Sequence, residues 1–485
     1  MSTAVLERGP EAATHESRLF ASLARELLHQ LSILIRNSYL HPLSNAVFVE
    51  PLTRAQNATE HILEVERSLK LELVGAEFFA NGKHLRMEIR SLHAYRYMRE
   101  ELTRAGLGGL EFGGAPSRAA LSGLLQALRD VRSKPDPDVE TFNEMLVSQG
   151  IHAFRGLPPR EASLEPGRQA AIGRRQRAIQ AYEQVLDFIR DSMMNHESPA
   201  QIDLRRAKRS VQRLVDLSFE EGEGFSLAGM AAIKGHDSYT FNHMVNVCIL
   251  AIAFGQRLGL KRRDLARLGL GALYHDMGKL HIPLEILNKP ATLTEEEWAV
   301  MGNHTVYAAR TLFPLIEQDP DTITRILAAL QHHLNYDGSG YPKLRILKTQ
   351  SLIARIIAIA DTFDAMTTKR LYQRRFLPDE AMKALVEMAG MRYDPVLVKA
   401  FINCMGVFPV GSAVLLTTGE IAVVIESNAD PDRVHQPRVR VVTDAAQQAI
   451  QPAEADLTAP AEAQRQIVRC VDAEEFGINA ASYAF

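Results

Sequence analysis

The sequence LGALYHDMGKL runs from Leu270 to Leu280 and places His275 beside Asp276, with Lys279 three residues later. A neutral imidazole and a carboxylate at adjacent positions can bind a metal pair together, with one ligand per ion or with the carboxylate bridging both. An isolated His-Asp pair is more often a solvated turn or a helix cap. The metal-site interpretation therefore depends on further ligands elsewhere in the chain.

Further imidazoles and a carboxylate occur in four other segments. Seven of the sixteen histidines fall between residues 236 and 333, which favours a site over unrelated surface histidines. Mixed imidazole and carboxylate ligands without a thiolate suit iron, manganese or zinc. The additional candidates are His243, His304 in GNHTVYAAR, His332 and His333 in HHLNYDGSGYP, and Asp361 at the end of RIIAIAD.

Length and composition limit the class of protein. A chain of 485 residues is too long for one hydrophobic core and indicates roughly two to four domains. Apolar residues make up 46% and charged residues 23%, as in ordinary globular proteins. The net charge of -3 and the pI near 6.6 give no reason to expect a nucleic acid polymer as a partner.

The cysteines and the N-terminus indicate a compartment. Cys248, Cys404 and Cys470 are far apart, which fits unpaired thiols in a reducing environment. Charged residues at positions 7, 8 and 11 occupy the place where a signal peptide needs an apolar core. No apolar run approaches the ~18 residues of a membrane span. We therefore expect a soluble, cytoplasmic protein without a membrane segment.

Residues 1–155 are predicted to form a helical domain with a small hairpin. Apolar residues recur at helical spacing from Ser17 onward. Asn81 and Gly82 separate two strand-like runs and favour a tight hairpin turn, and Ser117 is a suitable N-cap for a later helix. No chemical motif occurs here. We interpret the region as a regulatory or dimerisation domain, and ligand sensing stays open.

The remainder of the chain divides by composition. Residues 156–170 are a predicted linker, since GLPPREASLEPGR holds three prolines and two glycines. Residues 171–405 read as almost wholly helical, led by a long helix that either couples two domains or packs in the next one. Residues 406–485 are rich in Val and Ile, with Gly419 at an expected turn, and predict a small β unit. The predicted fold class is mainly α.

Five segments in order resemble the HD-GYP family of cyclic di-GMP phosphodiesterases, within the HD metal-dependent phosphohydrolase superfamily. The resemblance covers residues near 205 to 405, and Gly340, Tyr341 and Pro342 are its most selective element. It implies that residues 171–405 form a helical HD-GYP catalytic domain. The segments are HDSYTFNH, LGALYHDMGK, NHTVYAA, HHLNYDGSGYP and IIAIADTFDAMTTKRLY.

The resemblance also implies a ligand set. In the family, a helical bundle holds two or sometimes three metal ions, usually iron or manganese, and a water between them attacks phosphorus. Asp276 would bridge the ions. The matching ligands are His243, His275, Asp276, His304, His332, His333 and Asp361.

Other positions match residues that serve the substrate. Lys279 would offset charge that develops on the phosphate oxygens. Tyr341 and Arg370 match positions that hold the dinucleotide. Asp364 and Asp237 match acidic positions near the site, which either support a ligand or contact the substrate.

Three positions depart from the family pattern. Leu334 follows the histidine pair where the family usually has an acid, so a carboxylate expected near the metals is missing. Tyr239 stands where members with three metals have a glutamate, so we expect two ions. Gln373 replaces a basic residue expected three positions after Arg370, which would weaken phosphate binding.

The leading hypothesis is a phosphodiesterase that converts cyclic di-GMP to linear pGpG or GMP. A second hypothesis, motivated by Leu334 and Gln373, is a catalytically impaired signalling module that binds cyclic di-GMP or protein partners. A third is a phosphohydrolase of another nucleotide. Homodimer formation and signalling protein partners stay open.

Overall fold

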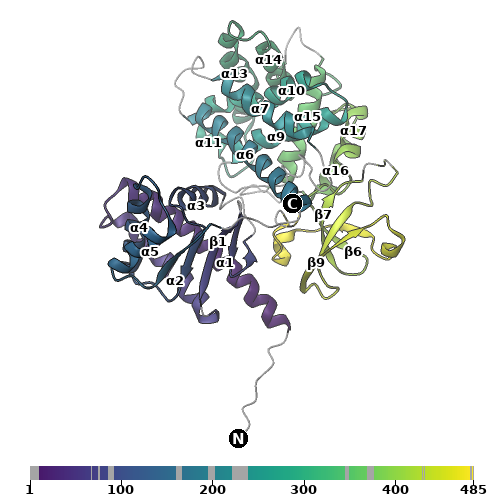
Figure 1. Ribbon diagram of the computed structural model, residues 1–485. Coiled ribbons are helices and arrows are strands. Elements are labelled where there is room, and N and C mark those ends of the chain that lie inside the picture. Colours follow the sequence, from purple (N-terminus) through teal and green to yellow (C-terminus); the bar gives the residue numbers. More distant parts are fainter. Residues whose placement is uncertain are drawn as a thin grey trace. The chain divides into compact units, whose positions relative to one another are not determined.

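The computed structural model describes residues 10–66, 68–74, 77–85, 92–159, 166–194, 203–220, 239–343, 349–368, 376–428, 430, 432–480 and 483. Contacts divide the chain into two compact units, Met1–Glu165 and Pro166–Phe485. Figure 1 labels their elements. The division falls inside the predicted linker, residues 156–170.

The first unit combines helices with a five-stranded antiparallel sheet of order β3-β2-β1-β4-β5. One hydrophobic core, which extends from Phe20 to Phe154, joins the helices to the sheet. The strands are β1 (Leu69–Val74), β2 (Glu77–Ala80), β3 (Lys83–His84), β4 (Gly109–Phe112) and β5 (Phe154–Leu157). The helices are α1 (Pro10–Leu40), η1 (Ala46–Phe48), α2 (Val49–Val65), α3 (Leu92–Arg104), α4 (Arg118–Arg132) and α5 (Val139–Ser148).

The predicted hairpin is confirmed, but it is part of this larger sheet. Asn81 and Gly82 connect β2 to β3 with φ angles of 48° and 74°, which Asn and Gly adopt most readily. Strand β4 lies in the glycine-rich GLGGLEFGG, and β5 extends into the predicted linker, so neither was predicted. A Cβ atom on Gly109 would lie 2.2 Å from the Leu71 carbonyl oxygen, so glycine permits the pairing of β4 with β1.

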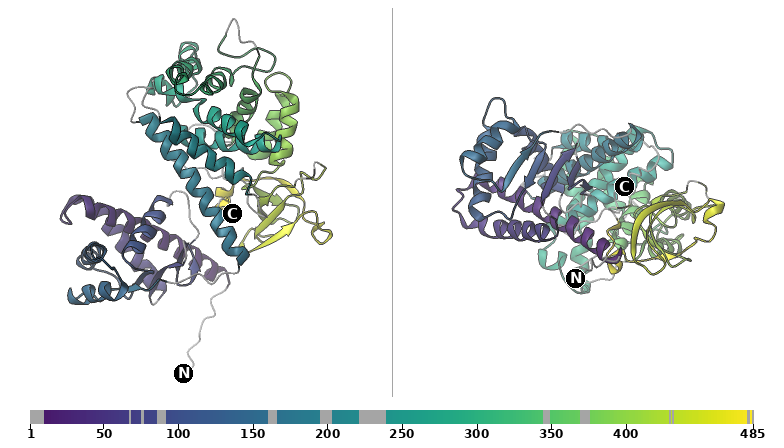
Figure 2. Two further views of the ribbon diagram at one scale, coloured as in Figure 1. Left: turned by 45° about the horizontal axis from the view of Figure 1, so that its top comes forward. Right: turned by 60° about the horizontal axis from the view of Figure 1, so that its bottom comes forward.

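The second unit begins with a helical bundle. Helix α6 packs against α7 and α9 (Figure 2). The longer helices are α6 (Pro166–Met194), α7 (Leu204–Ser218), α9 (Tyr239–Arg257), α10 (Arg262–Tyr274), α13 (His304–Leu312), α14 (Thr322–Gln331), α15 (Leu352–Thr367), α16 (Pro378–Glu387) and α17 (Pro395–Met405). Shorter elements between α10 and α14 are η4 (Met277–His281), α11 (Leu284–Leu287), α12 (Glu295–Gly302) and η5 (Phe313–Ile316).

Helices α9 and α15 lie inside the bundle because they are apolar around most of their circumference. Every residue from 243 to 255 of α9 and from 356 to 361 of α15 is buried. The few polar side chains of these helices are therefore buried with them, and a buried polar group is costly unless it is paired. This places His243, Asn246, Asp361 and Asp364 in a dry interior where they face one another.

The unit ends in a second five-stranded antiparallel sheet of order β10-β6-β7-β8-β9. Gly419 has a φ of 86° in the turn between β6 and β7, as predicted. The Cys470 backbone N–H donates to Asp379 Oδ2 at 3.0 Å, which ties β10 to α16. The strands are β6 (Ala413–Leu416), β7 (Ile421–Glu426), β8 (Arg438–Thr443), β9 (Ala449–Asp456) and β10 (Ile467–Cys470). The mainly α fold class with a C-terminal β unit is confirmed.

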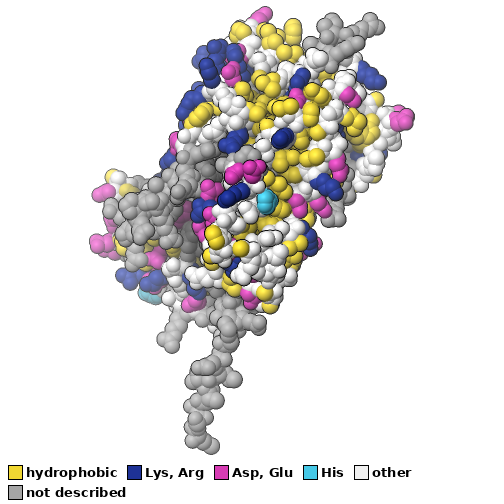
Figure 3. Space-filling view, turned by 90° about the vertical axis from the view of Figure 1, so that its right-hand side faces the viewer, with side chains coloured by type: hydrophobic (Ala, Val, Ile, Leu, Met, Phe, Trp, Pro, Cys, Tyr) yellow, Lys and Arg dark blue, Asp and Glu magenta, His cyan; other side chains and the backbone are white. Residues whose placement is uncertain are grey.

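The surface mixes charges of both signs with apolar side chains. Figure 3 shows this mixture on one face of the molecule. It agrees with the small net charge of -3. In the described part of the chain, no helix combines the length and the apolar composition that a membrane span requires.

Candidate metal centre

All seven residues expected as metal ligands lie together in the bundle. Ligands that converge from several helices are a common way to build a metal site in such a fold. Their ligand atoms form three overlapping groups, each with all atoms within 4.8 Å of one another. The groups are Asp276 with His304, His332 and His333; His243 with His275 and Asp276; and His275 with His332 and Asp361.

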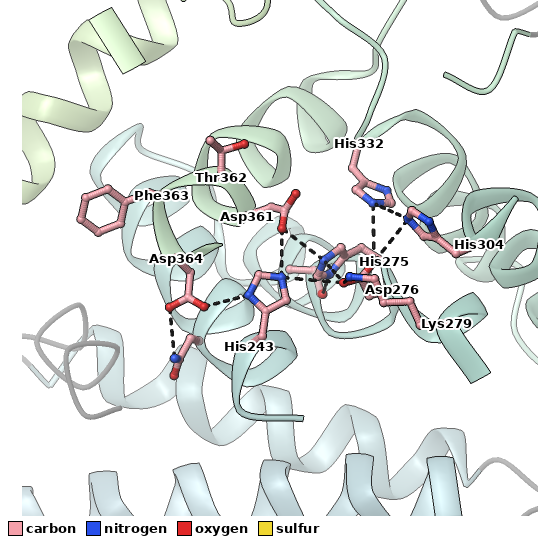
Figure 4. Close-up of polar contacts among 12 residues, drawn as sticks. His243, His275, Asp276, Lys279, His304, His332, Asp361, Thr362, Phe363 and Asp364 are labelled. Carbon is pink, nitrogen blue, oxygen red and sulfur yellow. Dashed lines mark hydrogen bonds and ion pairs between the residues drawn. The ribbon is translucent and has the colours of Figure 1, made fainter. Parts of the chain in front are cut away.

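Asp276 belongs to two of these groups, as do His275 and His332, and its two oxygens face different imidazoles. Its Oδ1 is 3.4 Å from His304 Nε2, and its Oδ2 is 3.3 Å from His275 Nε2 and 3.7 Å from His243 Nε2. The Lys279 ammonium forms an ion pair with the same carboxylate. Figure 4 shows imidazoles on both sides of Asp276. This is the position that a carboxylate bridging two ions requires.

Three of the histidines are oriented by backbone carbonyl groups that precede them in the chain. The Nδ1 atoms of His275, His304 and His332 lie 2.6, 2.7 and 2.8 Å from the carbonyl oxygens of the residues three positions earlier. A carbonyl oxygen only accepts, so each Nδ1 carries the proton and donates it. The Nε2 lone pair is then free to bind a metal inside the cluster.

A glycine brings two ligand-bearing segments together. Helix α10 ends at Tyr274, and the chain turns through His275 and Asp276 into η4. Gly278 of η4 packs directly on the backbone at the start of α13. Because glycine has no Cβ atom, Asp276 can approach His304 from the neighbouring helix.

Electrostatics keep the two carboxylates ionised. Burial opposes the charge on Asp276, but Lys279 and His275 outweigh it and hold the pKa of Asp276 well below its usual range. Burial likewise opposes the charge on Asp361, but the neighbouring His243 and His275 outweigh it and hold its pKa well below that range. The cluster therefore has a negative centre.

The imidazoles differ in how burial and neighbouring charges shift their pKa. Burial lowers the pKa of His333 to about 3 and, together with the neighbouring imidazoles, holds the pKa of His332 well below its usual range. Burial also acts on His275, but Asp276 and Asp361 outweigh it and raise its pKa to about 10. The negative field that attracts a proton to His275 would attract a divalent cation to the same nitrogen.

Two buried polar atoms test whether these residues fit a metal. His275 Nε2 and Asp276 Oδ1 have no hydrogen-bond partner among the residues that the structure describes. Leaving such atoms unpaired in a dry interior is costly, and coordination to a cation would remove the cost. The donors are imidazoles and carboxylates without a thiolate, which suits iron, manganese or zinc. The residues fit a metal centre.

Asp364 lies behind His243 and supports it. Its Oδ2 is 2.8 Å from His243 Nδ1, and its Oδ1 accepts from Asn246 Nδ2 at 3.1 Å. Asp364 is 1% exposed. Of the two roles expected for it, this position favours orienting a ligand over contacting a substrate. The prediction missed Asn246; the signal available was its spacing, three residues after His243, as Asp364 is three after Asp361.

The GYP element, residues 340–342, packs against His333, the second residue of the histidine pair. The Tyr341 ring stacks on His333 with centroids 4.7 Å apart and an angle of 32° between planes. Its backbone N–H donates to the His333 carbonyl oxygen at 3.1 Å. A Cβ atom on Gly340, whose φ is 89°, would lie 2.4 Å from that oxygen, so this position requires glycine.

Several other predicted positions lie outside the described part of the chain. Asp237, Arg370 and Gln373 lie outside the described residues. Tyr239 is the first residue of α9, and its side chain is also outside them. Leu334 is buried, and its carbonyl oxygen accepts from Gln350 Nε2. Among the described residues, Asp276 and Asp361 supply the carboxylates of the ligand groups.

The bundle is similar to known proteins. The HD domain family model matches residues 228–397. The cyclic di-GMP phosphodiesterase PA4108 of Pseudomonas aeruginosa is 35% identical over 44% of this chain and 51% of its own length. The cyclic di-GMP phosphodiesterase response regulator RpfG of Xanthomonas campestris pv. campestris is 33% identical over 47% and 64%.

A third relative has a different substrate in its name. The 3'3'-cGAMP-specific phosphodiesterase 3 of Vibrio cholerae is 32% identical over 36% of this chain and 38% of its own length. In all three comparisons the chain spans less than two thirds of the relative. Residues 228–397 thus match the HD domain family, and over this region the chain is similar to cyclic di-GMP phosphodiesterases of the HD-GYP type.

Proposed function

We propose that this protein is a metal-dependent phosphodiesterase that hydrolyses cyclic di-GMP to linear pGpG or GMP. The observation that carries the proposal is the buried group of five imidazoles and two carboxylates around Asp276. The names of the relatives from Pseudomonas and Xanthomonas support the substrate.

The seven side chains, Asp276 among them, would hold two divalent cations, iron or manganese. Such a pair supplies an activated water and neutralises phosphate charge. The hydrogen bonds of His275, His304 and His332 to backbone carbonyls hold the ligating nitrogens in place before any ion binds.

The reaction adds water to phosphorus and breaks one bond from phosphorus to a ribose 3′ oxygen. That oxygen takes up a proton and leaves as a hydroxyl group. Lys279, beside Asp276, would balance the negative charge that develops on the phosphate oxygens. We assign Tyr341 to the dinucleotide, and likewise Arg370 and Asp237, which lie outside the described residues.

A second candidate function is hydrolysis of another cyclic dinucleotide. The Vibrio relative named for 3'3'-cGAMP is almost as similar to this chain as the relatives named for cyclic di-GMP. These ligands differ in one purine base, and the metal cluster contacts the phosphate rather than the base. The cluster therefore favours neither substrate.

The test is anaerobic purification with Mn²⁺ or Fe²⁺, followed by chromatographic assay of cyclic di-GMP and 3'3'-cGAMP beside an Asp276→Ala control. Turnover of cyclic di-GMP that the control abolishes supports the proposal. Turnover of 3'3'-cGAMP alone supports the second candidate. Stoichiometric metal without turnover of either nucleotide supports the impaired signalling module that Leu334 and Gln373 motivate.

A further inference from the structure

A chain of buried hydrogen bonds connects helix α6 to the candidate metal centre. Tyr182 of α6 donates its hydroxyl proton to Asn246 Oδ1 at 3.3 Å. Asn246 Nδ2 donates to Asp364 Oδ1 at 3.1 Å, and Asp364 Oδ2 lies 2.8 Å from His243 Nδ1. His243 Nε2 then faces Asp361 Oδ1 at 2.9 Å. Every side chain in this series of hydrogen bonds is buried.

The donors and acceptors in this series of hydrogen bonds can be assigned in only one way. An amide group donates only through nitrogen and accepts only through oxygen, so Asn246 must turn its Nδ2 to Asp364 and its Oδ1 to Tyr182. Its orientation therefore depends on both neighbours. The Asp364 carboxylate is held by Asn246 on one oxygen and accepts from His243 Nδ1 on the other. That bond directs His243 Nε2 into the cluster.

We propose that Asn246 and Tyr182 are positioning residues, which set the orientation of the His243 ring through Asp364 and so tie metal affinity to the position of helix α6. This inference rests on the proposed function, because it assumes that His243 binds a metal ion. It adds two residues and a supporting helix that no motif of the catalytic site contains.

Tyr182 lies on α6, so the position of this helix affects the hydrogen bonds that lead to the metal ligands. Helix α6 begins at Pro166, directly after the last residue of the first unit, Glu165. A hydrogen bond weakens beyond about 3.5 Å, so a small shift of α6 breaks the Tyr182 contact. Asn246 is then free to rotate, and Asp364 loses a fixed partner. A change in the position of α6 would therefore reach the metal ligands through this series of hydrogen bonds.

The experiment measures Mn²⁺ affinity of the full chain without nucleotide, for the wild-type protein, Asn246→Leu and Tyr182→Phe. Tyr274→Phe is the matched control, because Tyr274 is fully buried, packs on Phe188 of α6 at 6.3 Å between ring centroids, and lies outside the hydrogen-bond chain. Loss of a direct partner of a metal ligand typically lowers affinity about 10- to 100-fold, and Asn246→Leu should reach about the lower end of that range because Asn246 bonds Asp364 rather than His243 itself. Tyr182→Phe removes one neutral hydrogen bond, so a loss of about 2- to 10-fold is expected.

Two readouts separate positioning from general stability. The electron paramagnetic resonance spectrum of bound Mn²⁺ should change in Asn246→Leu and Tyr182→Phe, and affinity should fall for one of the two ions only. Thermal unfolding without metal should match the wild-type protein for Tyr274→Phe, and it should show only a modest loss for Tyr182→Phe, which leaves the buried Asn246 Oδ1 without its donor. Wild-type affinity and spectrum in Tyr182→Phe and Asn246→Leu, or an equal loss in Tyr274→Phe, would overturn the inference. A wild-type protein that binds no Mn²⁺ would instead refute the metal centre, and both proposals with it.

Discussion

The carbonyl oxygen of His304 lies 1.8 Å from the position that a Cβ atom on Gly278 would occupy. The contact joins the backbone of η4, two residues after Asp276, to the first residue of α13. No side-chain rotation can relieve a clash with backbone atoms. The distance between two groups of candidate ligands therefore depends on one missing methyl group.

Gly278→Ala should displace η4 from α13 and separate Asp276 from His304. We expect a loss of about 1–3 kcal/mol in the free energy of unfolding, as for other overpacked sites, and a larger relative loss of Mn²⁺ affinity. Urea denaturation and metal titration measure the two effects. Gly302→Ala is the control, because its nearest contact is Tyr341 Cδ2 at 3.6 Å. Equal behaviour of the two variants would contradict the argument.

Addition of Mn²⁺ should raise the temperature of unfolding, and a chelator should reverse the change. A ligand that binds only the folded state stabilises it by about 2.7 kcal/mol at a concentration 100 times its Kd. The ions would also bind His275 Nε2 and Asp276 Oδ1, which have no hydrogen-bond partner in the described structure. Asp276→Asn should abolish the shift in calorimetry. A shift of wild-type size in that variant would place the ions elsewhere.

The stability of the bundle should fall in acid because of Asp319. Its carboxylate pairs with the buried Arg325 and lies 2.8 Å from Lys208 Nζ. Burial opposes the charge on Asp319, but Lys208 and Arg325 outweigh it and lower its pKa below the ordinary 3.8. A carboxyl with a lowered pKa stabilises the folded state above its unfolded pKa, and this contribution disappears as the pH falls through the folded value.

Asp319→Asn tests this sign. The variant should lose about 3 kcal/mol at pH 7, because it leaves the Arg325 guanidinium buried without its partner. It should also lose less stability than the wild-type protein between pH 5 and pH 2, as denaturant titrations at each pH would show. Asp321→Asn is the control, since its pair with Arg267 is partly exposed and contributes about 0–1 kcal/mol. The same acid profile in wild-type and Asp319→Asn would assign the loss to other carboxyls.

Two substitutions at Tyr341 separate its ring from its hydroxyl. Burial, followed by Asp276 and Asp361, raises the pKa of Tyr341, so the hydroxyl remains a proton donor at neutral pH. If it donates to a phosphate oxygen, Tyr341→Phe should raise KM for cyclic di-GMP about 5- to 10-fold, the value of one hydrogen bond, with unchanged Mn²⁺ affinity. Tyr341→Ala should also weaken Mn²⁺ binding, because the ring no longer packs on His333. Unchanged KM in the Phe variant would leave the ring as the only functional part.

Local signals were readable from the sequence because they act over a few residues. Ser117 accepts from the Ala120 N–H, as its residue type indicated, and Thr294 forms a capping box with Glu297 through the same local chemistry. The turn at Asn81 and Gly82 was predicted for the same reason. Strands β4 and β5 were missed, because pairing partners such as Leu110 and Leu71 are far apart along the chain and leave no local pattern.

The sequence alone determined the ligand types, their order along the chain and the helical class, since these depend on residue chemistry and short-range periodicity. Tertiary structure decided which atoms meet. His243 and Asp361 are 118 residues apart and lie 2.9 Å apart only because α9 and α15 are buried side by side. The hydrogen bond between Tyr182 and Asn246 was equally invisible, because a tyrosine and an asparagine in two apolar helices become partners only when packing brings the helices together and excludes water.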